Sequence, residues 1–96
     1  MIPKRDDGWW NLKAIARSRG REIADFLRLA STRKFIDRLA EEIGRSPVER
    51  LRGNRADPRL AQGTWGHPAL GVRVLIWASL DDEVQICLRM AEDFEV

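Results

Sequence analysis

The chain has 96 residues, 44% of them hydrophobic and 33% charged, which is typical of a water-soluble globular protein with one domain over residues 1–96. It lacks an apolar run of 18 residues and an apolar signal segment after its start, and it has one cysteine and one histidine. This composition argues against a membrane span, an internal disulfide and a His/Cys metal cluster. We therefore expect a cytoplasmic protein without membrane contact, cofactor or bound metal.

The charge is distributed unevenly along the chain. Residues 1–62 hold fifteen Lys or Arg against nine Asp or Glu, a net charge of +6, whereas residues 63–96 hold two against six, a net charge of −4. Most of the basic residues are arginine, whose planar guanidinium group suits phosphate. The pattern indicates an anionic partner, with nucleic acid as the first candidate. The alternative is that these arginines lie on solvent-exposed helix faces and bind no partner.

The first part of the chain predicts a β-hairpin followed by a short helix. Residues 2–5 and 9–12 flank the sequence Asp-Asp-Gly, and a glycine after Asp between short extended segments is a hairpin-turn signal. Apolar residues at helical spacing predict a helix over residues 13–19. Gly20 is placed to end this helix in the left-handed conformation.

Two further helices are predicted before Gly44. Apolar residues at intervals of three and four over residues 23–30 predict the first, with Arg21 and Arg28 on its polar side. The second runs from a cap at Ser31 or Thr32 to about Gly44. Its predicted buried face consists of Phe35, Ile36, Leu39 and Ile43.

Charges in this third helix oppose its dipole, because Arg33 and Lys34 lie near its start and Glu41 and Glu42 near its end. Such an order costs roughly 0.3 to 1 kcal/mol per charge. A helix start with cations and free backbone N–H groups is suited to a phosphate. The alternative is that these exposed charges are merely tolerated.

A long arginine-bearing hairpin is predicted next. Residues 48–51 form a strand that pairs with a strand over residues 63–65. The eleven residues between them contain the turn pairs Gly-Asn and Asp-Pro, so we expect a hairpin tip that acts as a wing against a nucleic-acid backbone. Its polar contact residues would be Arg52, Asn54, Arg55 and Arg59.

The last third of the chain predicts two helices that serve as scaffold. Residues 70–78 fit either a strand or a buried helix, and Pro68, which suits the first turn of a helix, favours the helix. Ser79 is a predicted cap for a final helix ending near Phe94. In that helix we expect Cys87 to pack as a small apolar residue.

Residues that carry chemistry elsewhere have structural explanations here. His67 lacks a second histidine or a nucleophile motif, so we expect it to cap or bridge the helix that follows Pro68. Neighbouring acidic residues at 6–7, 41–42 and 81–83 are of the type that holds Mg²⁺ in nucleases, but each group also fits a turn, a helix start or a solvent-exposed helix face. The tryptophans are expected to fill the core, Trp65 and Trp77 above all, whereas Trp9 and Trp10 face opposite sides of a strand, which leaves open whether one of them is exposed. The sequence therefore predicts no enzyme.

Several strings in this order resemble the KilA-N domain of phages, prophages and large DNA viruses, which is related to the fungal APSES DNA-binding domain. They are Asp-Asp-Gly-Trp-Trp-Asn at 6–11, Asp-Phe-Leu-Arg-Leu at 25–29 with Ser-Thr at 31–32, Gly-Thr-Trp at 63–65 with His-Pro at 67–68, Leu70, and Trp-Ala-Ser at 77–79. The resemblance covers nearly the whole chain. Where the family usually has a larger apolar residue, this chain has Gly66.

The resemblance implies an α+β fold in which small β-hairpins pack against about five short helices, with a helical pair and a β wing presented to DNA. It implies non-catalytic binding of double-stranded DNA by a phage- or prophage-related transcription regulator, associated with the nucleoid if bacterial. The expected DNA-contacting residues are Lys13, Arg17, Arg21, Arg28, Arg33, Lys34, Arg52, Asn54, Arg55 and Arg59. The alternative is a protein-interaction module of the same fold, such as an inhibitor or an antirepressor-like partner.

Overall fold

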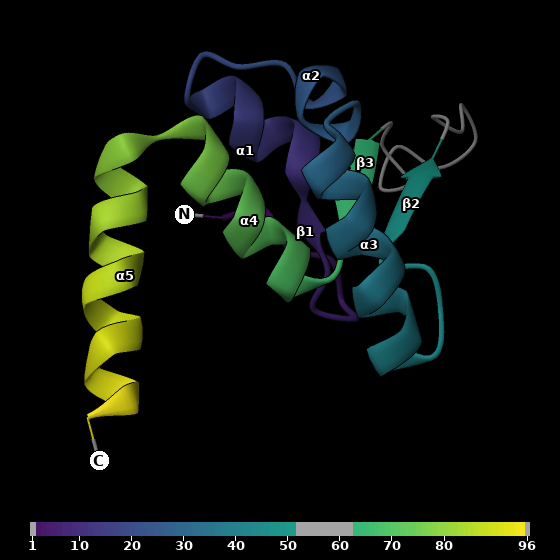
Figure 1. The fold of residues 1–96 in the computed structure, drawn as a ribbon. Coiled ribbons are helices and arrows are strands. Elements are labelled where there is room, and N and C mark those ends of the chain that lie inside the picture. Colours follow the sequence, from purple (N-terminus) through teal and green to yellow (C-terminus); the bar gives the residue numbers. More distant parts are fainter. Residues whose placement is uncertain (1, 52–62, 96) are drawn as a thin grey trace.

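The fold is α+β, with five helices and a three-stranded antiparallel sheet in the computed structural model, which describes residues 2–51 and 63–95 (Figure 1). The elements in chain order are β1 (Trp10–Asn11), α1 (Leu12–Ser18), α2 (Ile23–Leu27), α3 (Ala30–Ile43), β2 (Val48–Leu51), β3 (Gly63–Gly66), α4 (Pro68–Ala78) and α5 (Leu80–Phe94). The α+β class expected from the sequence is confirmed.

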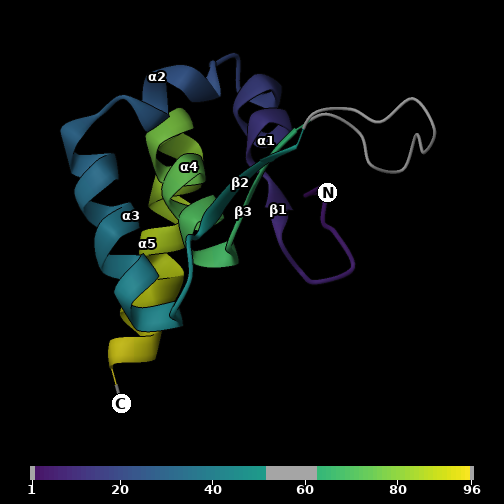
Figure 2. The ribbon, with the colours of Figure 1, turned by 90° about the vertical axis from the view of Figure 1, so that its right-hand side faces the viewer.

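The sheet has the strand order β1-β3-β2, so the last strand in the sequence lies in the middle (Figure 2). The predicted pairing of β2 with β3 is confirmed, with Arg50 opposite Thr64. On its other side β3 pairs with β1, with Trp10 opposite Gly66. This second pairing was not predicted, because a strand of two residues leaves almost no periodic signal.

The predicted opening turn is present, but its first arm is shorter than expected. Gly8 has a φ of 86°, and its N–H donates to the carbonyl oxygen of Arg5 at 2.9 Å. The arm at residues 2–5 forms only one isolated bridge, between Lys4 and Trp10. Pro3 has no N–H to donate, and its carbonyl accepts from Asn11 at 2.9 Å, so the ladder ends there.

The core lies between α1, α2, α4 and the sheet. Its fully buried members include Leu12, Ile15, Leu70 and Val74. Trp65 is buried, as predicted, and Trp77 is half-buried with its ring 5.3 Å from that of Phe26. The buried and half-buried aromatic rings therefore contribute to this core.

Neither of the adjacent tryptophans is exposed, which answers the question that the sequence left open. Trp9 is 6% exposed, and Trp10 is half-buried, lying against the backbone of Gly71 in α4. Gly66 also lies close to a neighbouring side chain, because a Cβ at that position would lie 2.6 Å from Leu12 Cδ1. Two glycines thus let an aromatic ring and a leucine approach the backbone closely.

The second and third helices are divided differently from the prediction. α2 ends at Leu27, because Leu29 is extended with φ −67° and ψ 136°. The next helix then begins at Ala30 with Leu29 as its N-cap, so the predicted cap at Ser31 or Thr32 was wrong. Thr32 is instead buried at 2% exposure, and the predicted core face of α3 is only half-buried. α3 ends at Gly44, as predicted, and this glycine adopts the left-handed conformation.

The junction before α4 settles the choice between strand and helix over residues 70–78 in favour of the helix. Pro68 is its first residue, and His67 Nδ1 accepts a hydrogen bond from the Ala69 N–H at 3.0 Å. The capping role predicted for His67 is confirmed. Asn11 caps α1 in the same way, accepting from the Ala14 N–H at 3.0 Å.

The final helix was placed correctly but packs much less than predicted. Ser79 caps α5 by accepting from the Asp82 N–H at 3.3 Å. No residue of α5 is buried, and Cys87 is exposed, so the expectation of a packed scaffold helix with a buried cysteine was wrong. In Figure 1 α5 extends along one side of the molecule, and its far end lies apart from α3. Its spacing revealed an amphipathic helix but not what covers the apolar face.

Candidate nucleic-acid interface

Two of the expected contact residues lie on the outer face of α1. Leu12, Ile15 and Ala16 form the buried side of this helix, which leaves Lys13 and Arg17 one turn apart on another side. The cap at Asn11 fixes where the helix begins and therefore which side chains face outward. Burial of the apolar face thus positions the two cations.

A hollow of about 290 Å³ lies beside these cations, between α1, α2 and the strands. It is lined by Lys13, Arg17, Glu22, Ile23, Ala24, Leu27, Arg50 and Thr64. A second hollow of similar volume shares two of these residues and is lined by Asn11, Lys13, Ala14 and Arg17. Three cationic side chains from two elements therefore line one concave surface that contains a single carboxylate.

Arg50 is a member of this set that the sequence reasoning missed. It lies on β2 opposite Thr64, and both residues line the hollow. The available signal was its position two residues before Arg52 in a predicted extended segment, where alternate residues share a face. The preceding residue, Glu49, is engaged elsewhere.

An ion pair tethers the opening turn to Glu49. Arg5 donates to Asp7 at 2.7 Å and to Glu49 at 3.3 Å, and its guanidinium carbon lies 5.3 Å from the ring centres of both Trp9 and Trp65. The hydrogen bond from Arg5 lowers the pKa of the Asp7 carboxyl below its ordinary value. Because neighbouring strand residues point to opposite faces, this pair leaves Arg50 on the side of the hollow.

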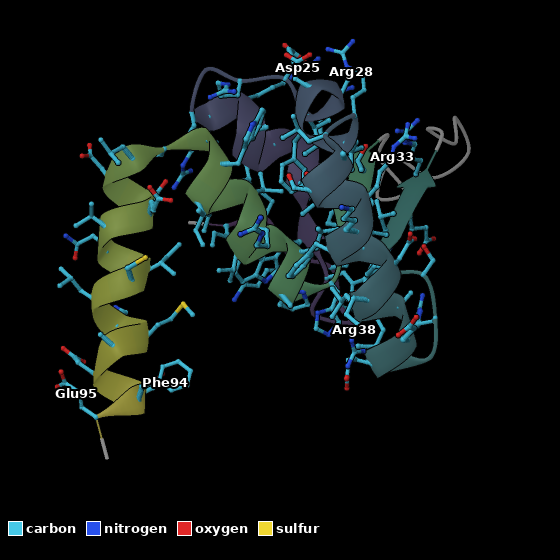
Figure 3. The ribbon with its side chains drawn as sticks, viewed as in Figure 1. Asp25, Arg28, Arg33, Arg38, Phe94 and Glu95 are labelled. Atoms are coloured by element: carbon cyan, nitrogen blue, oxygen red, sulfur yellow. The ribbon has the colours of Figure 1, made fainter. Side chains whose placement is uncertain are left out.

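Another group of predicted residues surrounds the connection between α2 and α3. Arg28 caps the end of α2 and is paired with Asp25. Arg33 and Lys34 are exposed near the start of α3, whose first turn has no acidic residue and no side-chain cap. Figure 3 shows Arg28 and Arg33 projecting outward at this end of the molecule. The N-terminal end of α3 is therefore electropositive.

The acidic end of the same helix is compensated locally. Arg38 forms ion pairs with Glu41, at 3.6 Å, and with Glu42. The charge order predicted for α3 is present, and its acids are engaged with a residue of their own helix. This pairing leaves the cations at the start of α3 as its distinctive charged feature.

Arg21 was expected on α2, but it lies in the connection before this helix, so that placement was wrong. Its guanidinium carbon lies 4.0 Å from the ring centre of Trp77 on α4, a cation–π distance. The described contacts thus assign it to packing beside the helical junction. The predicted wing residues Arg52, Asn54, Arg55 and Arg59 lie outside the described residues.

Two properties of the described residues bear on other kinds of site. Residues 2–51 and 63–95 contain no group of three His, Cys, Asp or Glu side chains placed to hold a metal ion. Within the same ranges, every helix is too short or too polar to cross a membrane.

Comparison with known families gives one match. The family model described as the KilA-N domain matches residues 1–92, which is nearly the whole chain. KilA-N domains are generally DNA-binding domains and are not typically enzymes. No curated protein and no solved structure shows significant similarity to the chain.

Proposed function

Since this chain belongs to the KilA-N domain family, we propose that it is a non-catalytic regulator of phage or prophage origin that binds duplex DNA mainly through phosphate contacts. The observation that carries this proposal is the hollow lined by Lys13, Arg17 and Arg50. None of these three forms an ion pair with another described residue. A concave surface whose cations are not paired with any described carboxylate is complementary to a phosphate backbone.

The start of α3 extends the proposed surface. Arg33 and Lys34 bring two further cations to a helix end with free N–H groups, and Arg28 lies at the adjoining end of α2. We propose that the wing completes the surface with Arg52, Asn54, Arg55 and Arg59. Arg21 would lie at its edge, since its guanidinium group stacks on Trp77.

The salt dependence of binding to a labelled duplex tests this proposal. The logarithm of affinity should fall linearly with the logarithm of salt concentration, with a slope of about −0.9 for each phosphate neutralised. Replacing Lys13, Arg17 and Arg50 together by alanine should reduce the magnitude of the slope by about 2 to 3. A flat salt dependence of the unmodified protein would contradict the function itself.

Two variants refine the test. Alanine at both Arg33 and Lys34 should weaken binding without unfolding the protein, because both side chains are exposed. Alanine at Arg38 is the matched control on the same helix, since this cation is already paired with its own acids. If the control weakens binding as much as the double variant, our placement of the surface on α3 is wrong.

The second candidate function is a protein-interaction module of the same fold. The observation that favours it is α5, which exposes large apolar side chains. Capture of partners from lysate with and without nuclease separates the two functions, because a protein partner should remain when DNA is destroyed.

A further inference from the structure

The longest helix of the described chain exposes its apolar side to solvent. Leu80 is 72% exposed, Leu88 56% and Phe94 83%, and Val84 and Met90 are each exposed by nearly half. Cys87 is exposed among them. Several large apolar side chains gathered on one element are typical of an interaction site. Figure 3 shows Phe94 projecting from the far end of this helix.

The exposed residues form one stripe that the rest of the domain does not use. Intervals of three, four and seven residues place Leu80, Val84, Cys87, Leu88, Ala91 and Phe94 on one side of α5. The contact of α5 with the core comes from Ile86, which lies on a different side. Asp82 fastens the start of the helix to Arg19 at 2.8 Å. α5 is therefore held by its first half while the stripe stays open.

Acidic residues border this stripe. α5 and its C-cap contain six carboxylates and one cation, and helical spacing puts that cation, Arg89, opposite the stripe. Asp81 and Glu92 lie along one edge of the stripe, and Glu83 lies along the other. Neither Asp81 nor Glu92 has an ion-pair partner among the described residues.

The helix dipole accounts for the positions of only three of these six acidic residues. Asp81, Asp82 and Glu83 lie in the first turn, where they complement the helix dipole. Glu92, Asp93 and Glu95 lie at the opposite end, where negative charge is unfavourable. A partner that supplies positive charge would offset that cost.

We propose that the α5 stripe is a docking surface for a helix of another protein, one whose apolar face is bordered by Lys or Arg. Charge complementarity selects this occupant, because opposite charges would border the shared apolar contact along its length. Two α5 helices of the same kind would instead bring carboxylates together in either orientation. The proposal deepens the second candidate function and does not depend on DNA binding.

Cys87 provides an internal probe, because it is the only cysteine of the chain and lies within the stripe. The test measures its rate of modification by a small aromatic disulfide reagent at neutral pH. A three-heptad synthetic helix with a leucine face bordered by Lys and Arg should slow modification roughly tenfold at saturation, since access to the thiol controls the rate. The same leucine face bordered by Glu should give little protection.

Matched variants test the location of docking. Leu88→Glu should weaken binding of the basic peptide at least about tenfold, or 1.4 kcal/mol. Gln85→Glu adds the same charge beside the acidic edge, outside the apolar contact, and should not weaken binding. Circular dichroism and the salt dependence of DNA binding check that both variants are folded. These last measurements separate failure of docking from failure of the DNA-binding function.

Several results would contradict docking of a basic helix on the α5 stripe. Equal protection by basic and acidic peptides, no protection by either, or equal effects of the two variants would each overturn the proposal. Sedimentation that shows a dimer dissociated by Leu88→Glu would assign the stripe to a second copy and would also overturn it.

Discussion

At the scale of single residues, close packing against glycine backbone shapes the side of the fold that carries the sheet. A Cβ at Gly71 would lie 2.1 Å from a ring carbon of Trp10, a distance that real contacts do not reach. Because this contact joins β1 to α4, it links the opening segment to the last third of the chain. Glycine here serves the approach of a ring, since the position itself is helical.

Gly71→Ala should therefore destabilise the protein, although alanine is the better helix former by roughly 0.5 to 1 kcal/mol. We expect a net loss of about 1 to 3 kcal/mol in the free energy of unfolding, because the tryptophan ring must move. Urea unfolding followed by tryptophan fluorescence measures this loss. Trp10→Leu in the Gly71→Ala background should recover part of it, and strict additivity of the two changes would contradict the proposed contact.

At the scale of elements, a small number of polar contacts orient α5. Its first residues are fixed by the Ser79 cap and by the bond from Arg19 to Asp82, whose side chains are about one-third exposed. This hydrogen bond from Arg19 lowers the pKa of Asp82 below its ordinary value of 3.8. Since the folded state favours the charged carboxylate, the pair stabilises the fold above that value and less as the pH falls below it.

Asp82→Asn should lower the free energy of unfolding by roughly 0.2 to 1 kcal/mol at neutral pH, the usual range for an exposed pair. The difference between the variant and the unmodified protein should shrink as the pH falls through about 4 and into the range where Asp82 is protonated. Denaturant unfolding of both proteins across this range is the measurement. A difference that is independent of pH would show that the charge of Asp82 is not the cause.

At the scale of the whole molecule, the uneven charge seen in the sequence becomes a division between elements. Cations cluster about the hollow and the start of α3, whereas carboxylates gather on α5. No described residue of α5 lines the hollow, and the ion pair of Arg19 with Asp82, which joins α1 to α5, uses residues of neither surface. We infer that the two surfaces act independently.

If the two surfaces are independent, a variant that combines changes in both should show the sum of the two separate effects on binding. Leu88→Glu should leave the salt dependence of DNA binding unchanged, and the triple alanine variant at Lys13, Arg17 and Arg50 should leave peptide protection of Cys87 unchanged. Their combination should show both defects, with coupling below about 0.5 kcal/mol. DNA affinity measured with and without saturating peptide tests the same independence. A change in the free energy of DNA binding larger than about 0.5 kcal/mol would show that the two surfaces are coupled.

Local signals explain how much of this architecture could be predicted from the sequence. Gly8, Gly20 and Gly44 mark real chain reversals, and Pro68 marks a real helix start, because each effect depends only on nearby backbone. The break between α2 and α3 was predicted at Ser31 or Thr32 and not at Leu29, because the apolar stripe continues across Leu29. No local rule makes a leucine extended, so residue spacing alone does not mark the break.

The candidate site was less predictable for the same reason. Lys13 and Arg17 could be assigned to a helix face by spacing, but their meeting with Arg50 depends on how α1 lies against the sheet. The position of Arg21 on Trp77 depends on α4, far away in the sequence. Exposure of Cys87 was missed because amphipathic spacing does not distinguish a face covered by the same chain from one left open.

The central position of β3 has a consequence for the order of folding during synthesis. Apart from the single bridge between Lys4 and Trp10, both other strands of the described sheet pair with residues Gly63–Gly66, so neither has a full strand partner while the ribosome is still making the first sixty residues. Closing contacts over such a separation is slow compared with forming the helices. We therefore expect nascent chains to carry α1 to α3 as loosely packed helices until the middle strand emerges. Pulse proteolysis of stalled chains should show protection appearing abruptly once this strand and α4 have left the exit tunnel.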